Sequence, residues 1–220
     1  MKTGRTGREA YPWQGYEWEA LYRLSVHPRT RGAYRYGLLI PGPPQSKPRA
    51  IAHHPWPWTR LYRVPEGWLV LSREREVAGY ALEDLSQRPI RTGPFLLLWG
   101  RAPWDGEARF RFLVSPRWVR EKARYIDRVT RGLTWPAGKP KAPLQVIKAV
   151  NEVTREVLAA WEAGAFLPYP TANRWDKTVR RRLWRFLTGT AHLPGREARA
   201  LMKRGVLLLT PRILGKGEEG

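Results

Sequence analysis

The chain of 220 residues carries 40 Lys and Arg residues against 19 Asp and Glu residues, a net charge of +21. A field of this size is typical of proteins with a polyanionic partner, which is nucleic acid or, less often, an anionic membrane surface. The absence of Cys excludes disulfides, thiolate metal sites and cysteine nucleophiles. A hydrophobic content of 42% excludes a disordered basic tail and is enough for a folded core.

The kind of cation narrows the class of partner. Only nine of the basic residues are Lys, and the planar guanidinium of Arg matches phosphates and base edges and stacks on rings. The lack of Cys and the presence of only two Met are typical of thermophilic proteins. No secretion signal is visible, and the longest apolar runs are too short for a transmembrane segment. We therefore expect a cytoplasmic or virion-internal protein without cofactors.

The N-terminal half shows mainly two-residue periodicity, which predicts strands. Alternating apolar residues from Tyr16 to Val26 predict the first strand, and a Pro-Glu-Gly turn predicts a hairpin. The second strand of that hairpin is apolar on both faces, so we expect it to be central. The predicted later strands and the hairpin lie at residues 34–40, 61–64, 68–71, 95–99 and 110–114. Together these strands predict an antiparallel sheet or a small barrel.

After Ser115 the periodicity becomes helical. Ser115-Pro116 predicts a helix start, Pro143 a second start and Thr171 a third, because Ser, Thr and Pro favour the first positions of helices. A short fourth helix is predicted from about Gly195 to Arg204, followed by a strand at residues 206–209. The fold class expected is therefore α+β, with a β-rich N-terminal half and a helical C-terminal half that has a helix-turn-helix-like end.

Four segments follow from these patterns: a flexible basic arm at 1–15, a β-rich domain at 16–115, a helical basic domain at 116–214 and a tail at 215–220. Residues 1–115 contain 18 bases and 10 acids, a net charge of +8. Residues 116–220 contain 22 bases and nine acids, a net charge of +13. The helical half thus carries the stronger field.

The third predicted C-terminal helix is the strongest candidate for a binding surface. Its apolar face contains Trp175, Val179 and Leu183, and its basic residues lie opposite or beside that face. These basic residues are Arg174, Lys177, Arg180, Arg181, Arg182 and Arg185. Solvated helix faces usually mix charges of both signs, whereas Asp176 is the only acid in this helix. We therefore predict that this helix contacts phosphates.

The following residues extend the candidate surface. The order of basic helix, turn, short basic helix and strand resembles a helix-turn-helix motif with a β wing, in which one helix enters the major groove. The resemblance rests on element order alone, and a helical subdomain that caps the sheet is the alternative. The short helix contributes Arg196, Arg199, Lys203 and Arg204 to the candidate nucleic-acid-binding residues.

Aromatic residues suggest a second mode of binding. Trp56 and Trp58 lie in a Pro-rich loop, and Trp104 lies in a second loop. Exposed rings near Arg stack on unpaired bases, so these three are candidate base-stacking residues. The alternative is that the loops fold back and cover an edge of the sheet.

Catalytic patterns are sparse. The spacing of the four His residues fits no zinc pattern, and no phosphate-binding loop or nucleophile elbow is present. Asp105 and Glu107 form a carboxylate pair of the kind that holds Mg²⁺, although an Asp-Gly turn produces the same letters.

The leading hypothesis is a non-enzymatic nucleic-acid-binding protein, with DNA favoured over RNA. One alternative is an assembly protein of a virion or nucleoprotein complex, which packs against a genome, anionic lipid or an acidic subunit. The other is a replication or processing enzyme that uses Asp105 and Glu107.

Overall fold

The computed structural model describes residues 11–43, 47–52, 58–101, 106–131 and 142–215. It has antiparallel sheets in the N-terminal half and helices in the C-terminal half, which confirms the α+β class. The chain divides into two compact units, Met1–Leu113 and Val114–Gly220. We call them the sheet unit and the helical unit. Within the described residues, no helix is both long enough and apolar enough to cross a membrane.

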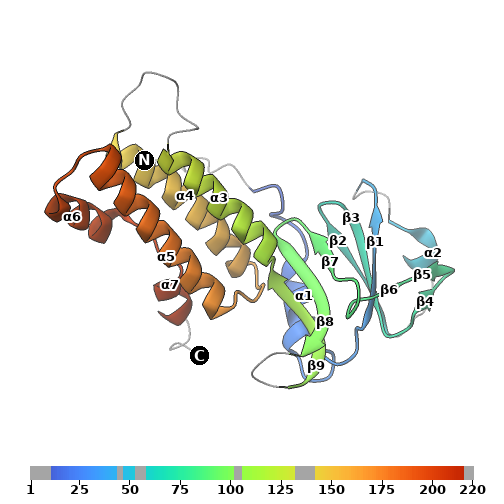
Figure 1. Ribbon diagram of the computed structural model, residues 1–220. Coiled ribbons are helices and arrows are strands. Elements are labelled where there is room, and N and C mark those ends of the chain that lie inside the picture. The colour runs from blue at the N-terminus through green and yellow to red at the C-terminus, as the bar shows by residue number, and fades with distance from the viewer. Residues whose placement is uncertain (1–10, 44–46, 53–57, 102–105, 132–141, 216–220) are drawn as a thin grey trace, which may run out of the picture. The chain divides into compact units, whose positions relative to one another are not determined.

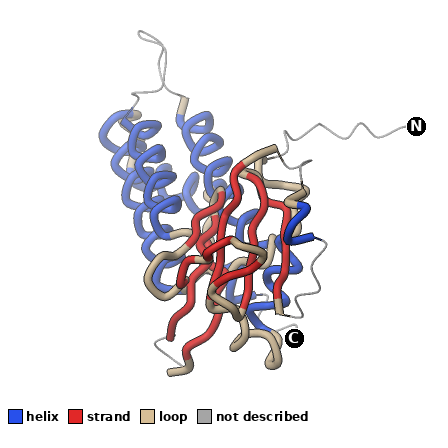
Figure 2. The backbone as a smooth tube through the Cα atoms, turned by 90° about the vertical axis from the view of Figure 1, so that its right-hand side faces the viewer, coloured by secondary structure: helices blue, strands red, loops and turns tan. Residues whose placement is uncertain are grey.

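The sheet unit contains three sheets, whose strands are red in Figure 2. The largest sheet has the order β2-β3-β1-β6, and the other two have the orders β4-β5 and β7-β8-β9. The described strands do not close into a barrel. Their bounds are β1 Tyr36–Pro41, β2 Thr59–Val64, β3 Gly67–Ser72, β4 Glu76–Val77, β5 Tyr80–Ala81, β6 Glu83–Asp84, β7 Ile90–Thr92, β8 Phe95–Arg101 and β9 Ala108–Val114.

The predicted hairpin is confirmed as β2 and β3, and β3 is central because β1 pairs with its other edge. Gly67 ends the turn with a φ of 147°. A Cβ atom added there would lie 2.2 Å from the carbonyl oxygen of Ile40, so only glycine allows β1 to approach this closely. The turn therefore fixes the alignment of all three strands.

The prediction of a strand from Tyr16 to Val26 is wrong, because Trp18–Val26 forms helix α1. Its buried residues Trp18, Leu21 and Leu24 recur every three positions, while Tyr22 and Val26 from the alternating pattern are exposed. Trp18 packs on Phe95 of β8 with ring centroids 4.3 Å apart. Helix α1 therefore covers the β7-β8-β9 sheet and closes an aromatic core.

The described end of the predicted basic arm belongs to the same core. Trp13 is buried, and its ring meets Phe95 edge-on at 5.7 Å. Lys2, Arg5 and Arg8, like the rest of residues 1–10, lie outside the described residues. A second core joins Ile51 of the short helix α2 (Arg49–Ala52) with Val70 of β3, Val77 and Leu82.

The helical unit is built from α3 (Pro116–Arg131), α4 (Pro143–Glu162) and α5 (Tyr169–Arg185). The π-helical turn η1 (Phe186–Thr190) joins α5 to α6 (Gly195–Gly205), and α7 (Thr210–Gly215) follows. Helices α3, α4, α5 and α6 confirm the helical periodicity, although α5 begins at Tyr169 rather than after Thr171. Helices α3 and α5 contact each other and run parallel, with α4 antiparallel to both (Figure 1).

The predicted strand at residues 206–209 is absent, and with it the β wing. Side chains from other helices take the hydrogen bonds that a ladder would have used. Asn151 accepts from the Leu207 N–H at 2.8 Å and donates to the Gly205 carbonyl at 2.6 Å. Apolar residues at 206–209 therefore pack as an extended connection between α6 and α7.

Candidate nucleic-acid interface

The predicted basic helix α5 presents its cations to solvent as expected from its periodicity. Trp175, Val179 and Leu183 are buried in the helical unit. Five of the six predicted basic residues are exposed: Arg174, Lys177, Arg180, Arg181 and Arg185. The sixth, Arg182, is half-buried and forms an ion pair with Asp127 of α3.

Asp176, the only acid of α5, does not reduce the charge of this surface. It is 5% exposed, and its carboxylate accepts from the backbone N–H groups of Leu209 at 2.8 Å and Thr210 at 2.9 Å. The carboxylate thus caps the first turn of α7, where N–H groups lack partners within the helix. The exposed face of α5 therefore carries no acid.

Helix α3 carries a second row of arginines beside α5. Successive helical residues are rotated by about 100° about the helix axis. Arg120, Arg124 and Arg131 therefore point within about 40° of one another, on the same side of α3 as Asp127. Because Asp127 contacts Arg182, this side of α3 adjoins α5. We call these three residues the α3 row. Each row spans eleven residues, so its length is about 16 Å.

The matching α5 row consists of Arg174, Arg181 and Arg185. These residues also lie within about 40° of one another about the axis of α5, opposite its buried face, and Arg182 lies between the row and that buried face on the side of α3. Both rows occupy three of the four positions i, i+4, i+7 and i+11, which recur on one side of a helix. The fourth position is Asp127 in α3 and Thr178 in α5. The two rows therefore border the junction between the helices from either side.

The Asp127–Arg182 ion pair also sets the relative level of the rows. Since the helices run parallel, the start of the α3 row at Arg120 lies beside the start of the α5 row along the helix axes. In the same way, Arg131 lies beside the end of the α5 row. Parallel packed helices have axes about 8–10 Å apart. The two rows thus form one basic platform, which we call the α3–α5 face.

Asp127 within the α3 row and Glu121 beside it are both already engaged. Asp127 binds Arg182 and lies 3.4 Å from Arg131, and Glu121 lies 3.0 Å from Arg117. Within the part of the chain that the structure describes, five arginines of the rows have no ion-pair partner: Arg120, Arg124, Arg174, Arg181 and Arg185. A platform with five unpaired guanidinium groups is suited to binding several phosphates at once.

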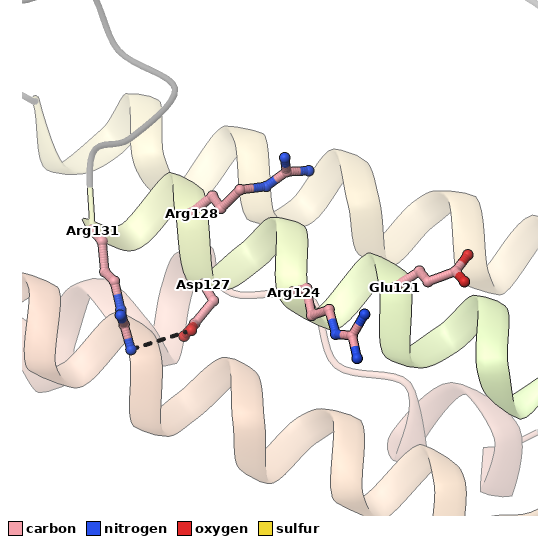
Figure 3. Close-up of a pocket in the computed structure, with 5 residues that line it drawn as sticks. All are labelled: Glu121, Arg124, Asp127, Arg128 and Arg131. Atoms are coloured by element: carbon pink, nitrogen blue, oxygen red, sulfur yellow. Dashed lines mark ion pairs between the residues drawn. The ribbon is translucent and has the colours of Figure 1, made fainter.

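The outer side of α3 is also hollowed. Five of its residues line an open depression of about 450 Å³: Glu121, Arg124, Asp127, Arg128 and Arg131. Figure 3 shows Arg124, Asp127 and Arg131 directed toward the neighbouring α5, while Arg128 extends to the opposite side of α3. Arg128 stacks on Tyr125 at 5.5 Å. The depression therefore combines three arginines with two carboxylates.

The basic residues of α6 form a separate exposed group. Arg196, Arg199, Lys203 and Arg204 are exposed, and Arg199 lies 5.8 Å from the ring of Trp184 on α5. The order α5, π-helical turn, α6 retains the helix pair of the predicted motif without its wing. Lys177 and Arg180 lie on the side of α5 that faces away from α3.

The remaining predicted residues lie in the sheet unit or outside the description. Trp56, Trp104 and Asp105 lie outside the described residues. Trp58 is 43% exposed, and Arg73 covers its ring at 4.6 Å. Glu107 forms an ion pair with Arg31 at 3.0 Å. No group of three or more potential metal ligands occurs among the residues described.

The arginines of α3 were not predicted as binding residues, although the sequence contains a signal for them. Arg120, Arg124 and Arg128 recur every four positions, and Arg117, Arg124 and Arg131 recur every seven. Both spacings place like charges on one side of a helix. That this side adjoins the basic side of α5 follows only from the packing of the two helices.

No family model matches the chain, and comparison with curated proteins and with solved structures likewise finds no match. Function must therefore be argued from the chemistry of the site.

Proposed function

We propose that this protein is a non-enzymatic nucleic-acid-binding protein that acts through the α3–α5 face. The supporting observation is a set of five exposed arginines on two packed helices that have no ion-pair partner among the described residues. Exposed charges of one sign repel one another, so such a surface is retained at a cost in stability unless an anionic partner binds it. Phosphate groups spaced along a polymer provide that partner.

DNA is the nucleic acid that we propose. The helix pair formed by α5 and α6 keeps the element order of a helix-turn-helix, and exposed cations on both helices suit backbone contacts. The net charge of +13 on residues 116–220, against +8 on residues 1–115, favours the helical unit as the binding unit.

Charge reversal on α5 tests this proposal. The variant Arg181→Glu/Arg185→Glu should lose affinity and lower the slope of log K against log salt concentration by about two, since each phosphate contact contributes about 0.9. Both residues are exposed, so folding should be retained. Fluorescence anisotropy with labelled DNA at several salt concentrations measures the slope.

A matched control reverses two charges on α4. Lys148 and Arg155 are exposed and have no ion-pair partner among the described residues. The variant Lys148→Glu/Arg155→Glu therefore makes the same change in net charge at another surface. Equal loss of slope in the two variants would attribute binding to total charge and overturn the proposed interface.

A further inference from the structure

We infer that the α3–α5 face binds the backbone of double-stranded DNA without selecting a base sequence. This inference rests on the proposed function and names its substrate class. Three features carry it: the width of the paired helices, the two-row arrangement of the arginines and the residue types on the face.

The width of the face prevents it from entering a groove. One helix with its side chains is about 10–12 Å across, and the major groove of B-form DNA, about 12 Å wide, admits a single helix. Helices α3 and α5 lie side by side and are joined by the Asp127–Arg182 ion pair, so both face the ligand together. The pair spans about 20 Å and therefore lies across the outside of the duplex, where the phosphates are.

The two rows match a ligand with two lines of phosphates. Each row extends about 16 Å, over which one strand of B-form DNA presents about five phosphates at 3.4 Å of rise. A single strand offers one such line, whereas a duplex offers two, one on each side of a groove. Both rows are held on helices in register, so they contact two strands without rearrangement of the backbone.

The rows lack the residue types that stack on bases or pair with adenine, and the width of the face keeps their arginines away from base edges in a groove. Proteins that bind single strands use exposed aromatic rings as stacking platforms, and neither row contains an aromatic residue. Three rings on the two helices have a cation against one face: Lys122 lies 5.2 Å from Trp118, Arg128 lies 5.5 Å from Tyr125, which is 37% exposed, and Arg199 lies 5.8 Å from Trp184. The rows also contain no Asn or Gln for pairing with adenine.

The inference is tested by comparing the affinity of the full chain for double-stranded and single-stranded DNA of the same sequence. Anisotropy is measured with a 20-base-pair duplex, with each of its separate strands, with two duplexes of unrelated sequence and with the corresponding RNA duplex. We expect the duplex to bind about tenfold more tightly than either strand, as a few added exposed charge contacts would give. Affinities for the three DNA duplexes should agree within about threefold, because nonspecific binding depends on phosphates alone.

One variant in each row links the preference to the face. Arg124→Gln/Arg181→Gln should reduce the ratio of duplex to single-strand affinity at least threefold, because it removes one contact from each row. Lys148→Gln/Arg155→Gln, which removes the same charge from α4, should leave that ratio unchanged.

Each remaining outcome has a distinct meaning. Steeply salt-dependent binding with a single strand equal to or tighter than the duplex would overturn the inference and leave the proposed function standing. A strong preference for one DNA sequence, or for duplex RNA, would also overturn it. The absence of salt-dependent binding to every probe would overturn the proposed function itself.

Discussion

The sheet unit and the helical unit are both rich in arginine, yet they use it differently. In the sheet unit Arg35 binds Asp84 at 2.7 Å, Arg88 binds Glu83 at 3.0 Å and Arg31 binds Glu107 at 3.0 Å. On the α3–α5 face the two acids are satisfied by other arginines, and five guanidinium groups remain unpaired among the described residues. Other arginines of the sheet unit, such as Arg75 and Arg91, are also exposed. The α3–α5 face therefore differs from the sheet unit in the alignment of its unpaired arginines along two packed helices.

The largest expected effect is a difference in salt dependence between variants of the helical unit and variants of the sheet unit. Arg120→Gln/Arg124→Gln removes two cations from α3 and should lower the salt slope by about two. Arg75→Gln/Arg91→Gln removes two exposed cations from the sheet unit and should change the slope by less than about 0.5. Anisotropy titrations of both variants at 50–200 mM salt provide the measurement. Equal slopes in the two variants would remove the distinction between the units.

The second prediction concerns Asp176, the buried acid of α5 whose carboxylate caps α7. Asp176→Ala leaves the N–H groups of Leu209 and Thr210 without their acceptor in a buried position. The free energy of unfolding should fall by about 3 kcal/mol, since charged hydrogen bonds contribute about 1.5–3 kcal/mol each and the two share one carboxylate. Urea denaturation measures the loss.

Glu152→Ala provides the control, because Glu152 is an exposed acid of the same unit. Its removal should change stability by less than about 0.5 kcal/mol. Similar losses in the two variants would show that net charge, and not the cap, explains the effect of Asp176→Ala.

The smallest predicted effect lies in the sheet unit and depends on pH. The Arg35 guanidinium, assisted by Ser86, lowers the pKa of Asp84 to about 2. Because the folded-state pKa is depressed, this contribution to stability is present above the unfolded-state value near 4 and is lost as the pH falls toward about 2. Asp84→Asn should therefore weaken the fall in stability between pH 4 and pH 2, while the salt slope for DNA at neutral pH stays unchanged. An unaltered acid profile would contradict this assignment.

Sequence periodicity predicts an element correctly where local preferences and tertiary packing favour the same structure. The β2–β3 hairpin and helices α4 and α6 follow from turn residues and apolar spacing. Residues 18–26 satisfy both a two-residue alternation and a three-residue repeat of Trp18, Leu21 and Leu24, and helix formation prevails. The Glu19–Arg23 ion pair, at i and i+4, was the local signal for that helix.

The errors and omissions arise where distant residues decide the outcome. The segment at 206–209 has strand-like composition, but its N–H groups bind Asn151 and Asp176, which lie 33 to 56 residues away in the sequence. The α5 row is visible in the sequence, whereas its continuation on α3 depends on which sides of two helices meet. No pattern within either helix contains that information.

The most direct test of the central claim is the salt dependence of binding between the unmodified protein and a 20-base-pair DNA duplex. Five unpaired arginines that each contact a phosphate predict a linear log–log plot with a slope of about −4.5. A slope between zero and about −1 would mean that the α3–α5 face does not bind the DNA backbone.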